Sequence, residues 1–389
     1  MQEAKRIGEP TDPGHFAAIE MLCDAQRDTG ELAAAIQECR QAYDQVLGTY
    51  GPTDGETPVL ARRLAKSLAA AGRSGEARKV LESEVSALQA RPSPANRRQL
   101  GATYVLLAEA EVRDGKPVEA DQWLHALARL GITDGKSPKQ PFLVVPDEAQ
   151  ANVLAMQGRL AAASAVIDSE LALLQANGGQ GHSPHAAALL GTAARVALAR
   201  GDLPAAEDAL ARMRQAYVWP ADEPAHPLSG FGMNARILAA QVALASKKYD
   251  AAAALAAEAR SLIDKRPDAV DYRLWSIPAE LVLGRVDLQA GRKDRALGHF
   301  DLAVTLARAS GDASLDLAEA LAWQARACLA TGHPQRAQAS AAEARVIVQK
   351  QKTSSPVYVG PLAAYDQALR AGPTAAGVLP PRSQTHEPA

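Results

Sequence analysis

Apolar residues along the chain recur with the period of an α-helix. Leu60, Leu64 and Leu68 follow one another at intervals of four. A second stripe with helical spacing comprises Val118, Leu124, Leu127 and Leu130. Such spacing gathers apolar side chains on one face of a helix. The only short run that could form a strand, PFLVVP at 141–146, is interpreted as an extended connector. The pattern predicts an all-α protein.

Turns interrupt these helical patterns at a regular interval. Turn-like glycines recur 42 or 43 residues apart at Gly30, Gly72, Gly115, Gly158 and Gly201, and occur again at Gly291 and Gly332. The interval from Gly201 to Gly291 is about twice as long, and Lys247 occupies the turn position in its middle. A period of about 20 to 50 residues is typical of solenoids, propellers and arrays.

Two small residues flank each turn at fixed distances. Seven residues before the turn residue stand Cys23, Ala65, Ala108, Ala151, Ala194, Ala240, Gly284 and Ala325. Five residues after it stand Ala35, Ala77, Ala120, Ala163, Ala206, Ala252, Ala296 and Ala337. Small side chains at a crossing let two helix axes approach to about 8 to 10 Å. Each unit is therefore predicted to be a helix hairpin, and proline-containing links separate successive hairpins.

The chain is predicted to consist of a lead, eight units, one further helix and a tail. Residues 1–15 form the lead and residues 16–350 form the repeat array. The units span approximately 16–50, 57–91, 96–131, 147–177, 184–218, 232–265, 272–310 and 314–350. A capping helix is expected at 361–371, and the tail at 372–389, rich in Pro, Thr and Ser, is expected to be disordered. Neighbouring hairpins must stack, because one hairpin cannot bury its own apolar face.

The seventh unit resembles a tetratricopeptide repeat (TPR). The residues that carry the resemblance are Leu283-Gly284, Ala290-Gly291-Arg292, Ala296-Leu297, Phe300 and Ala303. The other units keep the small pair and the turn, and their period of about 42–45 residues exceeds the family's usual length of about 34. Segments Val46-Leu47-Gly48, Gly51-Pro52 and Thr57-Pro58 resemble the longer repeats of kinesin light chain type. The resemblance implies a right-handed superhelical solenoid of about eight helix-turn-helix hairpins with a capping helix.

Composition narrows the classes of partner. The 42 Lys and Arg residues nearly balance the 44 Asp and Glu residues, so no net field favours nucleic acid or a membrane. No secretory signal and no apolar run of about 20 residues is present. Cys23, Cys39 and Cys328 lack metal-ligand spacing and are interpreted as small core residues in a reducing environment. A cytoplasmic location is predicted, with neither a nucleic acid nor a membrane as partner.

Candidate chemistry is sparse. The stretch LGITDGKS at 130–137 ends like a phosphate-binding loop, but Leu130 stands where that loop needs Gly, and a helix precedes it. His182 and His185 lie three apart without further metal-ligating neighbours, and the pair Arg62-Arg63 is interpreted as a solvated face. No nucleophile motif is recognisable. We therefore predict no catalytic, cofactor-binding or metal-binding residues.

One repeat position is polar in all eight units. It follows the first small residue and is occupied by Asp24, Lys66, Glu109, Asn152, Arg195, Gln241, Arg285 and Arg326. The resemblance implies that the first helices line a concave groove and that this position points into it. Arginine at Arg195, Arg285 and Arg326 then favours an acidic or carboxylate-bearing ligand. The alternative is an ordinary solvated helix face, because every amphipathic helix is polar somewhere.

The predicted function is that of a non-catalytic scaffold that binds a protein or peptide in the concave groove of a TPR superhelix. One alternative is a sensory or regulatory module of a larger bacterial serine/threonine kinase or transcription regulator, whose effector domain lies outside this chain. The other is an enzyme whose site is assembled in space within the groove. The sequence does not identify the partner, the pathway or the oligomeric state.

Overall fold

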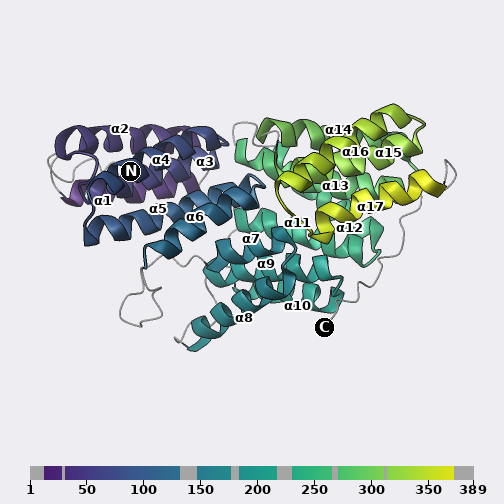
Figure 1. Ribbon diagram of the computed structural model, residues 1–389, viewed down its shortest axis with the longest axis horizontal. Coiled ribbons are helices and arrows are strands. Elements are labelled where there is room, and N and C mark those ends of the chain that lie inside the picture. Colours follow the sequence, from purple (N-terminus) through teal and green to yellow (C-terminus); the bar gives the residue numbers. More distant parts are fainter. Residues whose placement is uncertain are drawn as a thin grey trace. The chain divides into compact units, whose positions relative to one another are not determined.

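The computed structural model describes residues 13–28, 31–131, 147–176, 184–216, 230–264, 270–310 and 313–371. Within these ranges the secondary structure consists of helices α1 to α17 and includes no strand (Figure 1). The prediction of an all-α protein is confirmed. Most of the predicted lead, the connector at 141–146 and the predicted tail lie outside the described residues.

The first sixteen helices follow one another as pairs with a short link inside each pair. The first three pairs are α1 (Pro13–Asp28) with α2 (Leu32–Tyr50), α3 (Glu56–Ala70) with α4 (Ser74–Ala90), and α5 (Pro94–Arg113) with α6 (Pro117–Arg129). The next three are α7 (Asp147–Gln157) with α8 (Leu160–Ala176), α9 (Pro184–Arg200) with α10 (Leu203–Ala216), and α11 (Gly230–Ala245) with α12 (Tyr249–Asp264). The last two are α13 (Val270–Gln289) with α14 (Lys293–Ser310) and α15 (Leu315–Ala330) with α16 (Pro334–Lys350). We call the members of a pair its first and second helix.

Helix α17 (Pro356–Ala371) follows the last pair and begins five residues before the predicted capping helix. Proline is favoured in the first turn of a helix, and both Pro356 and Pro361 could mark a start. The carbonyl of Ser355 accepts the N–H groups of Tyr358 and Val359, so the helix starts at Pro356. Pro361 then lies inside the helix, where it lacks a backbone N–H to donate.

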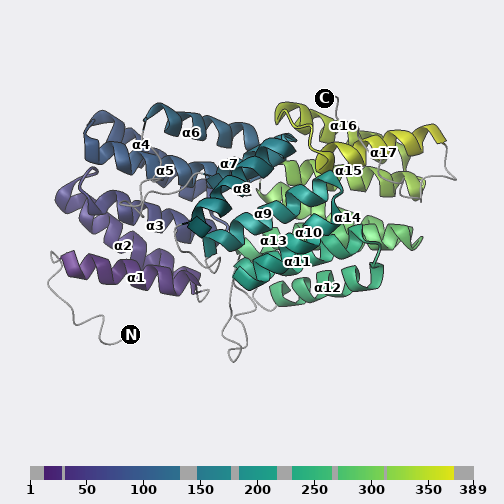
Figure 2. The same ribbon diagram turned by 90° about the horizontal axis from the view of Figure 1, so that it is seen from below.

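The chain forms two compact units. Helices α1 to α6 build unit 1 and helices α7 to α17 build unit 2, apart from short segments at the α5–α6 turn and around the α12–α13 link. In unit 1, α3 packs against α1, α2, α4 and α5. In unit 2, α9 packs against α8, α10 and α11, and α15 packs against α14, α16 and α17 (Figure 2). First helices thus contact first helices inside each unit, as α1, α3 and α5 do in unit 1 and α9 and α11 do in unit 2.

The turn inside each of the second to eighth pairs uses a left-handed backbone conformation. Gly72 has φ +69° and Gly201 has φ +77°, and Lys247 adopts φ +60° at the turn position predicted for it. The N–H of Arg73 donates to the carbonyl of Leu68 at 2.8 Å, a bond that closes the C-terminal turn of a helix. Glycine suits this conformation because it has no Cβ.

The small residues that flank the turns lie at the helix crossings. All sixteen are buried. Gly284 shows why one of them is glycine, because a Cβ added there would lie 2.6 Å from a ring carbon of Phe300. The aromatic ring of the seventh unit thus fills the space that an alanine methyl would need.

Cys23 and Cys39 are paired in the structure, which corrects the interpretation of all three cysteines as separate core thiols. Their Cα atoms lie 5.9 Å apart, a usual separation for a disulfide. The pairing arises because Cys23 of α1 and Cys39 of α2 are both buried inside the same hairpin. Cys328 is free and buried, and burial raises the pKa of its thiol.

Candidate functional site

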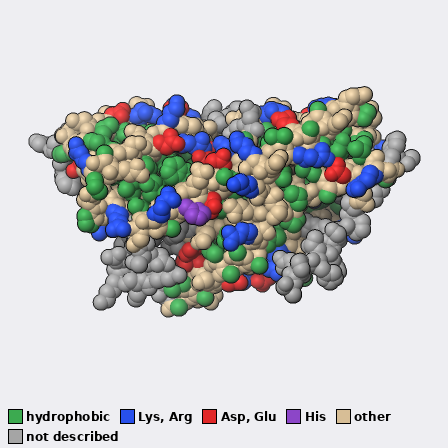
Figure 3. All heavy atoms as spheres, viewed as in Figure 1, with side chains coloured by type: hydrophobic (Ala, Val, Ile, Leu, Met, Phe, Trp, Pro, Cys, Tyr) green, Lys and Arg blue, Asp and Glu red, His purple; other side chains and the backbone are tan. Residues whose placement is uncertain are grey.

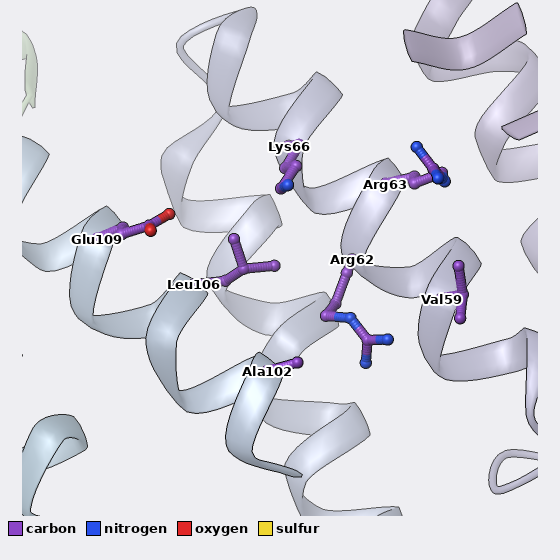
Figure 4. Close-up of a pocket in the computed structure, with 7 residues that line it drawn as sticks. All are labelled: Val59, Arg62, Arg63, Lys66, Ala102, Leu106 and Glu109. Atoms are coloured by element: carbon purple, nitrogen blue, oxygen red, sulfur yellow. The ribbon is translucent and has the colours of Figure 1, made fainter. Parts of the chain in front are cut away.

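A pocket of about 190 Å³ lies between the first helices α3 and α5 of unit 1 (Figure 4). Its wall consists of Val59, Arg62, Arg63 and Lys66 from α3 and Ala102, Leu106 and Glu109 from α5. Spacings of three and four residues place these side chains on one face of each helix. The pocket therefore combines an apolar floor with four charged side chains.

Arg62 is held firmly at the pocket wall. Its Nη1 donates to Oε1 of Glu84 at 2.8 Å, and its Nη2 donates to Oε1 of Gln99 at 2.6 Å. Burial lowers the pKa of Arg62, and the neighbouring Glu84 opposes that shift. Because Glu84 belongs to α4 and Gln99 to α5, Arg62 joins three helices.

Arg63 joins α3 to α1. Its guanidinium forms ion pairs with Glu20, at 2.9 Å, and with Asp24. Asp24 also accepts from Arg27 at 2.6 Å. Arg63 points away from Glu109 in the pocket (Figure 4). Because it pairs with Glu20 and Asp24, its charge is largely compensated by carboxylates of α1.

Lys66 and Glu109 face each other across the pocket (Figure 4). Burial lowers the pKa of Lys66, and Glu109 raises it. Burial raises the pKa of Glu109, and Lys66 and Arg113 lower it. Each group is partly removed from water, and each favours the charged form of the other. These two groups are therefore the ones best placed to bind a polar ligand within the pocket.

The structure brings three of the predicted site residues together in unit 1. Lys66 and Glu109 line the pocket, and Asp24 forms an ion pair with Arg63 of the pocket wall. Sequence reasoning missed the contribution of Arg62 and Arg63, which it treated as a solvated pair. The available signal was their position three and four residues before Lys66, which puts all three on one side of α3.

In unit 2, Arg195 of α9 occupies the same repeat position as Lys66 and forms hydrogen bonds to neighbouring helices. Nη2 of Arg195 donates to Oδ1 of Asn152 at 3.2 Å and to Oγ1 of Thr192 at 2.9 Å. Its Nη1 donates to Oδ1 of Asn234 at 3.2 Å. Arg195 therefore links α9 to α7 and α11. Gln241, the next predicted site residue, is half-buried on α11.

Arg285 and Arg326 both lie against Trp323. Their guanidinium carbons are 4.7 and 4.9 Å from the centre of its ring, within the range of cation–π attraction. Arg326 is only 1% exposed. Burial lowers its pKa to about 10, with a further contribution from Arg285. Arg326 is thus an interior residue and not an accessible groove residue.

Helix α17 covers this part of unit 2. It packs against α15 and α9, and its Leu362 and Tyr365 join the core cluster that contains Trp323. Burial raises the pKa of Tyr358 well above its ordinary value, and Asp316 and Glu319 raise it further, whereas Arg195 lowers it. Tyr358 therefore lies near the predicted stripe of basic residues, and α17 occupies the face that the first helices α9 and α15 present.

The segment before α17 is fixed to the turn between α7 and α8. The N–H of Ser354 donates to the carbonyl of Gln157 at 3.1 Å, and the hydroxyl of Thr353 donates to the carbonyl of Met156. Gly158 allows this approach, because a Cβ there would lie 2.6 Å from the backbone nitrogen of Ser355. These contacts anchor α17 at its start.

Basic and acidic side chains are interspersed on the face of the molecule drawn in Figure 3. Among the residues that the structure describes, no three His, Cys, Asp or Glu side chains are placed to hold a metal ion. No helix within the described ranges has both the length and the apolar character needed to cross a membrane.

No protein-family model matches this chain, and no curated protein is significantly similar to it.

Proposed function

We propose that this chain is a non-catalytic scaffold of TPR-like helix hairpins, wound as a right-handed superhelix, that binds a segment of a partner protein. The proposal places the ligand in the α3–α5 pocket of unit 1. One observation carries it: Lys66 and Glu109 face each other beside Leu106, in a pocket whose apolar wall also includes Val59 and Ala102.

A peptide segment matches this arrangement. The ammonium of Lys66 donates to a carboxylate or a main-chain carbonyl, and the carboxylate of Glu109 accepts a main-chain N–H. An adjacent apolar side chain would rest on Leu106. The proposed ligand is an acidic segment, or a C-terminal one, whose carboxylate is bound by Lys66 with Arg62 behind it.

The basic residues of unit 2 contribute less to this proposal. Arg195 already bonds Asn152 and Asn234, and Arg326 is buried beside Trp323. A ligand at these residues would have to displace interactions within the protein, including those of α17. We therefore place the first contacts with a partner in unit 1.

Site-specific photo-crosslinking tests the proposal. A photoreactive residue at position 102 reports on the pocket, and one at position 79 on α4, where Lys79 is exposed, serves as the control. We expect a partner to be crosslinked from cell lysate at position 102 and not at position 79. The crosslinked segment is then made as a peptide and its affinity measured by calorimetry.

The pocket variants Lys66→Ala and Glu109→Gln should each weaken the affinity for that peptide about tenfold. Lys79→Ala should leave the affinity unchanged. A peptide that binds both pocket variants as tightly as the wild-type protein would show that the ligand site lies elsewhere.

A further inference from the structure

A second cavity, of about 50 Å³, lies between α2, α3 and α4. Its wall includes Tyr43 and Leu47 of α2, Ala61 of α3, and Ser83, Glu84 and Ala87 of α4. Ala61 is buried at its base, whereas Ser83 is exposed and Tyr43 half-buried. The cavity therefore opens to solvent beside the second helices α2 and α4, and not on the side of the α3–α5 pocket.

Glu84 is the only charged residue among the described residues of this wall. Its side chain is 2% exposed. Oε1 accepts hydrogen bonds from Nη1 of Arg62 at 2.8 Å and from Oγ1 of Thr103 at 2.7 Å. Oε2 is buried and has no hydrogen-bond partner. A buried carboxylate oxygen without a donor is unfavourable. Oε2 has almost no accessible surface, so a ligand in the cavity can supply a donor once the Glu84 carboxylate turns toward it.

The charges around the cavity favour a cation. Burial raises the pKa of Tyr43, Glu84 and Asp44 raise it further, and Arg40 lowers it. Glu84 is thus the carboxylate of the cavity wall, while Asp44 and Arg40, which are not part of that wall, act on Tyr43 with opposite signs. Arg62 approaches Glu84 only through Oε1, on the side of the α3–α5 pocket.

The volume of the cavity limits the size of the cation that it can hold. One water molecule needs about 10 to 15 Å³ of such a volume, so the cavity holds a group of a few non-hydrogen atoms. The CH₂–NH₃⁺ end of an alkylamine has this size, and its methylene group would contact Ala61 and Ala87. A quaternary ammonium group has no N–H to donate to Oε2.

We propose that this cavity binds a primary alkylammonium group, which donates a hydrogen bond to Oε2 of Glu84 while its carbon stem packs against Ala61, Ala87 and Leu47. The lysine side chain of a partner protein and a small free amine share this chemistry. The proposal does not depend on the function proposed for the α3–α5 pocket.

Calorimetric titration of the full chain with methylammonium chloride tests the proposal, with tetramethylammonium chloride and KCl at equal ionic strength as comparisons. We expect saturable binding of methylammonium alone. Glu84→Gln removes the charge, and Ala87→Leu fills the cavity while keeping Glu84, so both should weaken binding at least about tenfold. Glu82→Gln, on the exposed side of α4, should bind as the wild type does. Thermal unfolding verifies that each variant is folded.

The affinity should also depend on pH. Burial raises the pKa of Glu84 to about 7, and the ammonium group binds the ionised carboxylate. The ionised fraction of such a group rises about tenfold between pH 6 and pH 8, and the affinity should rise by the same factor. The dependence should be absent in Glu84→Gln.

A tripeptide with one central lysine and its Nε-acetylated form distinguish the two sources of the ligand. Tighter binding of the lysine peptide than of methylammonium supports a partner's lysine, whereas equal or weaker binding supports a small amine. Equal binding of K⁺ and methylammonium, unchanged binding by Glu84→Gln and Ala87→Leu, or no saturable binding of any probe would overturn the proposal.

Discussion

The two units present their first helices in different ways. In unit 1, α3 and α5 form an open pocket in which Lys66 and Glu109 face each other. In unit 2, α17 packs on α9 and α15, and Arg326, at the same repeat position as Lys66, is 1% exposed. The repeat therefore fixes where a residue lies on its helix, but a segment outside the repeat decides whether that residue is accessible.

The arginines of the α3–α5 pocket and those beside Trp323 are also compensated differently. In unit 1, Arg62 and Arg63 pair directly with the carboxylates of Glu84 and Glu20. In unit 2, Arg285 and Arg326 share the ring of Trp323. Burial raises the pKa of Glu319 to about 7, and Arg285 lowers it. Arg285, Glu319 and Arg326 thus form one cluster around Trp323.

The largest effect should come from undocking α17. Tyr365→Ala removes a side chain that is 3% exposed and lies in the core cluster of unit 2, so we expect a loss of about 3 to 5 kcal/mol in the free energy of unfolding. Leu369→Ala on the same helix removes an exposed side chain and should cost less than about 0.5 kcal/mol. Denaturant unfolding measures both. Equal losses would mean that α17 does not cover unit 2 as described.

The next largest effect concerns the buried acid of unit 1. The pKa of Glu84 is about 7 in the folded protein, and its ordinary value is 4.5. Between these values the folded state holds a proton that the unfolded state has released, so stability falls as pH rises. From pH 4.5 to 8 we expect the wild type to lose about 3 kcal/mol relative to Glu84→Gln. Parallel pH profiles of the two proteins would contradict this.

A glycine pair tests the helix crossing in the seventh unit. Gly284→Ala places a Cβ 2.6 Å from the ring of Phe300 and should destabilise unit 2 by about 1 to 3 kcal/mol. Gly298→Ala, on α14, meets no atom within 4 Å and should stabilise it by about 0.5 to 1 kcal/mol. Thermal unfolding distinguishes the two, because the shifts should have opposite signs.

The smallest effect compares one repeat position in the two units. Arg195→Ala removes hydrogen bonds to Asn152 and Asn234 and should cost about 1 to 2 kcal/mol. Lys66→Ala removes an exposed side chain and should change stability by less than about 0.5 kcal/mol. Similar losses for both would remove the distinction between a structural position in unit 2 and an accessible one in unit 1.

The local features of this fold could be predicted from the sequence. Helices follow from the period of residues such as Leu60 and Leu64, and the turn at Lys247 follows from its spacing, because both depend on near neighbours in the chain. The position of α17 could not be predicted, since Tyr365 and Trp323 are brought together by packing between distant segments. The same holds for Glu84, whose contacts with Arg62 and Thr103 join three helices.

The anchor of α17 also has a consequence for the order in which the protein folds. Thr353 and Ser354 bond backbone groups 197 residues earlier in the chain, whereas each hairpin closes within about 40 residues. Contacts between residues that are close in the chain form quickly, whereas contacts between distant residues cannot form until the intervening chain has been made. At about 5 to 20 residues per second, the ribosome needs roughly 10 to 40 seconds to make that intervening chain. During this interval the α7–α8 turn and the buried face of α15, once made, remain uncovered on the nascent protein.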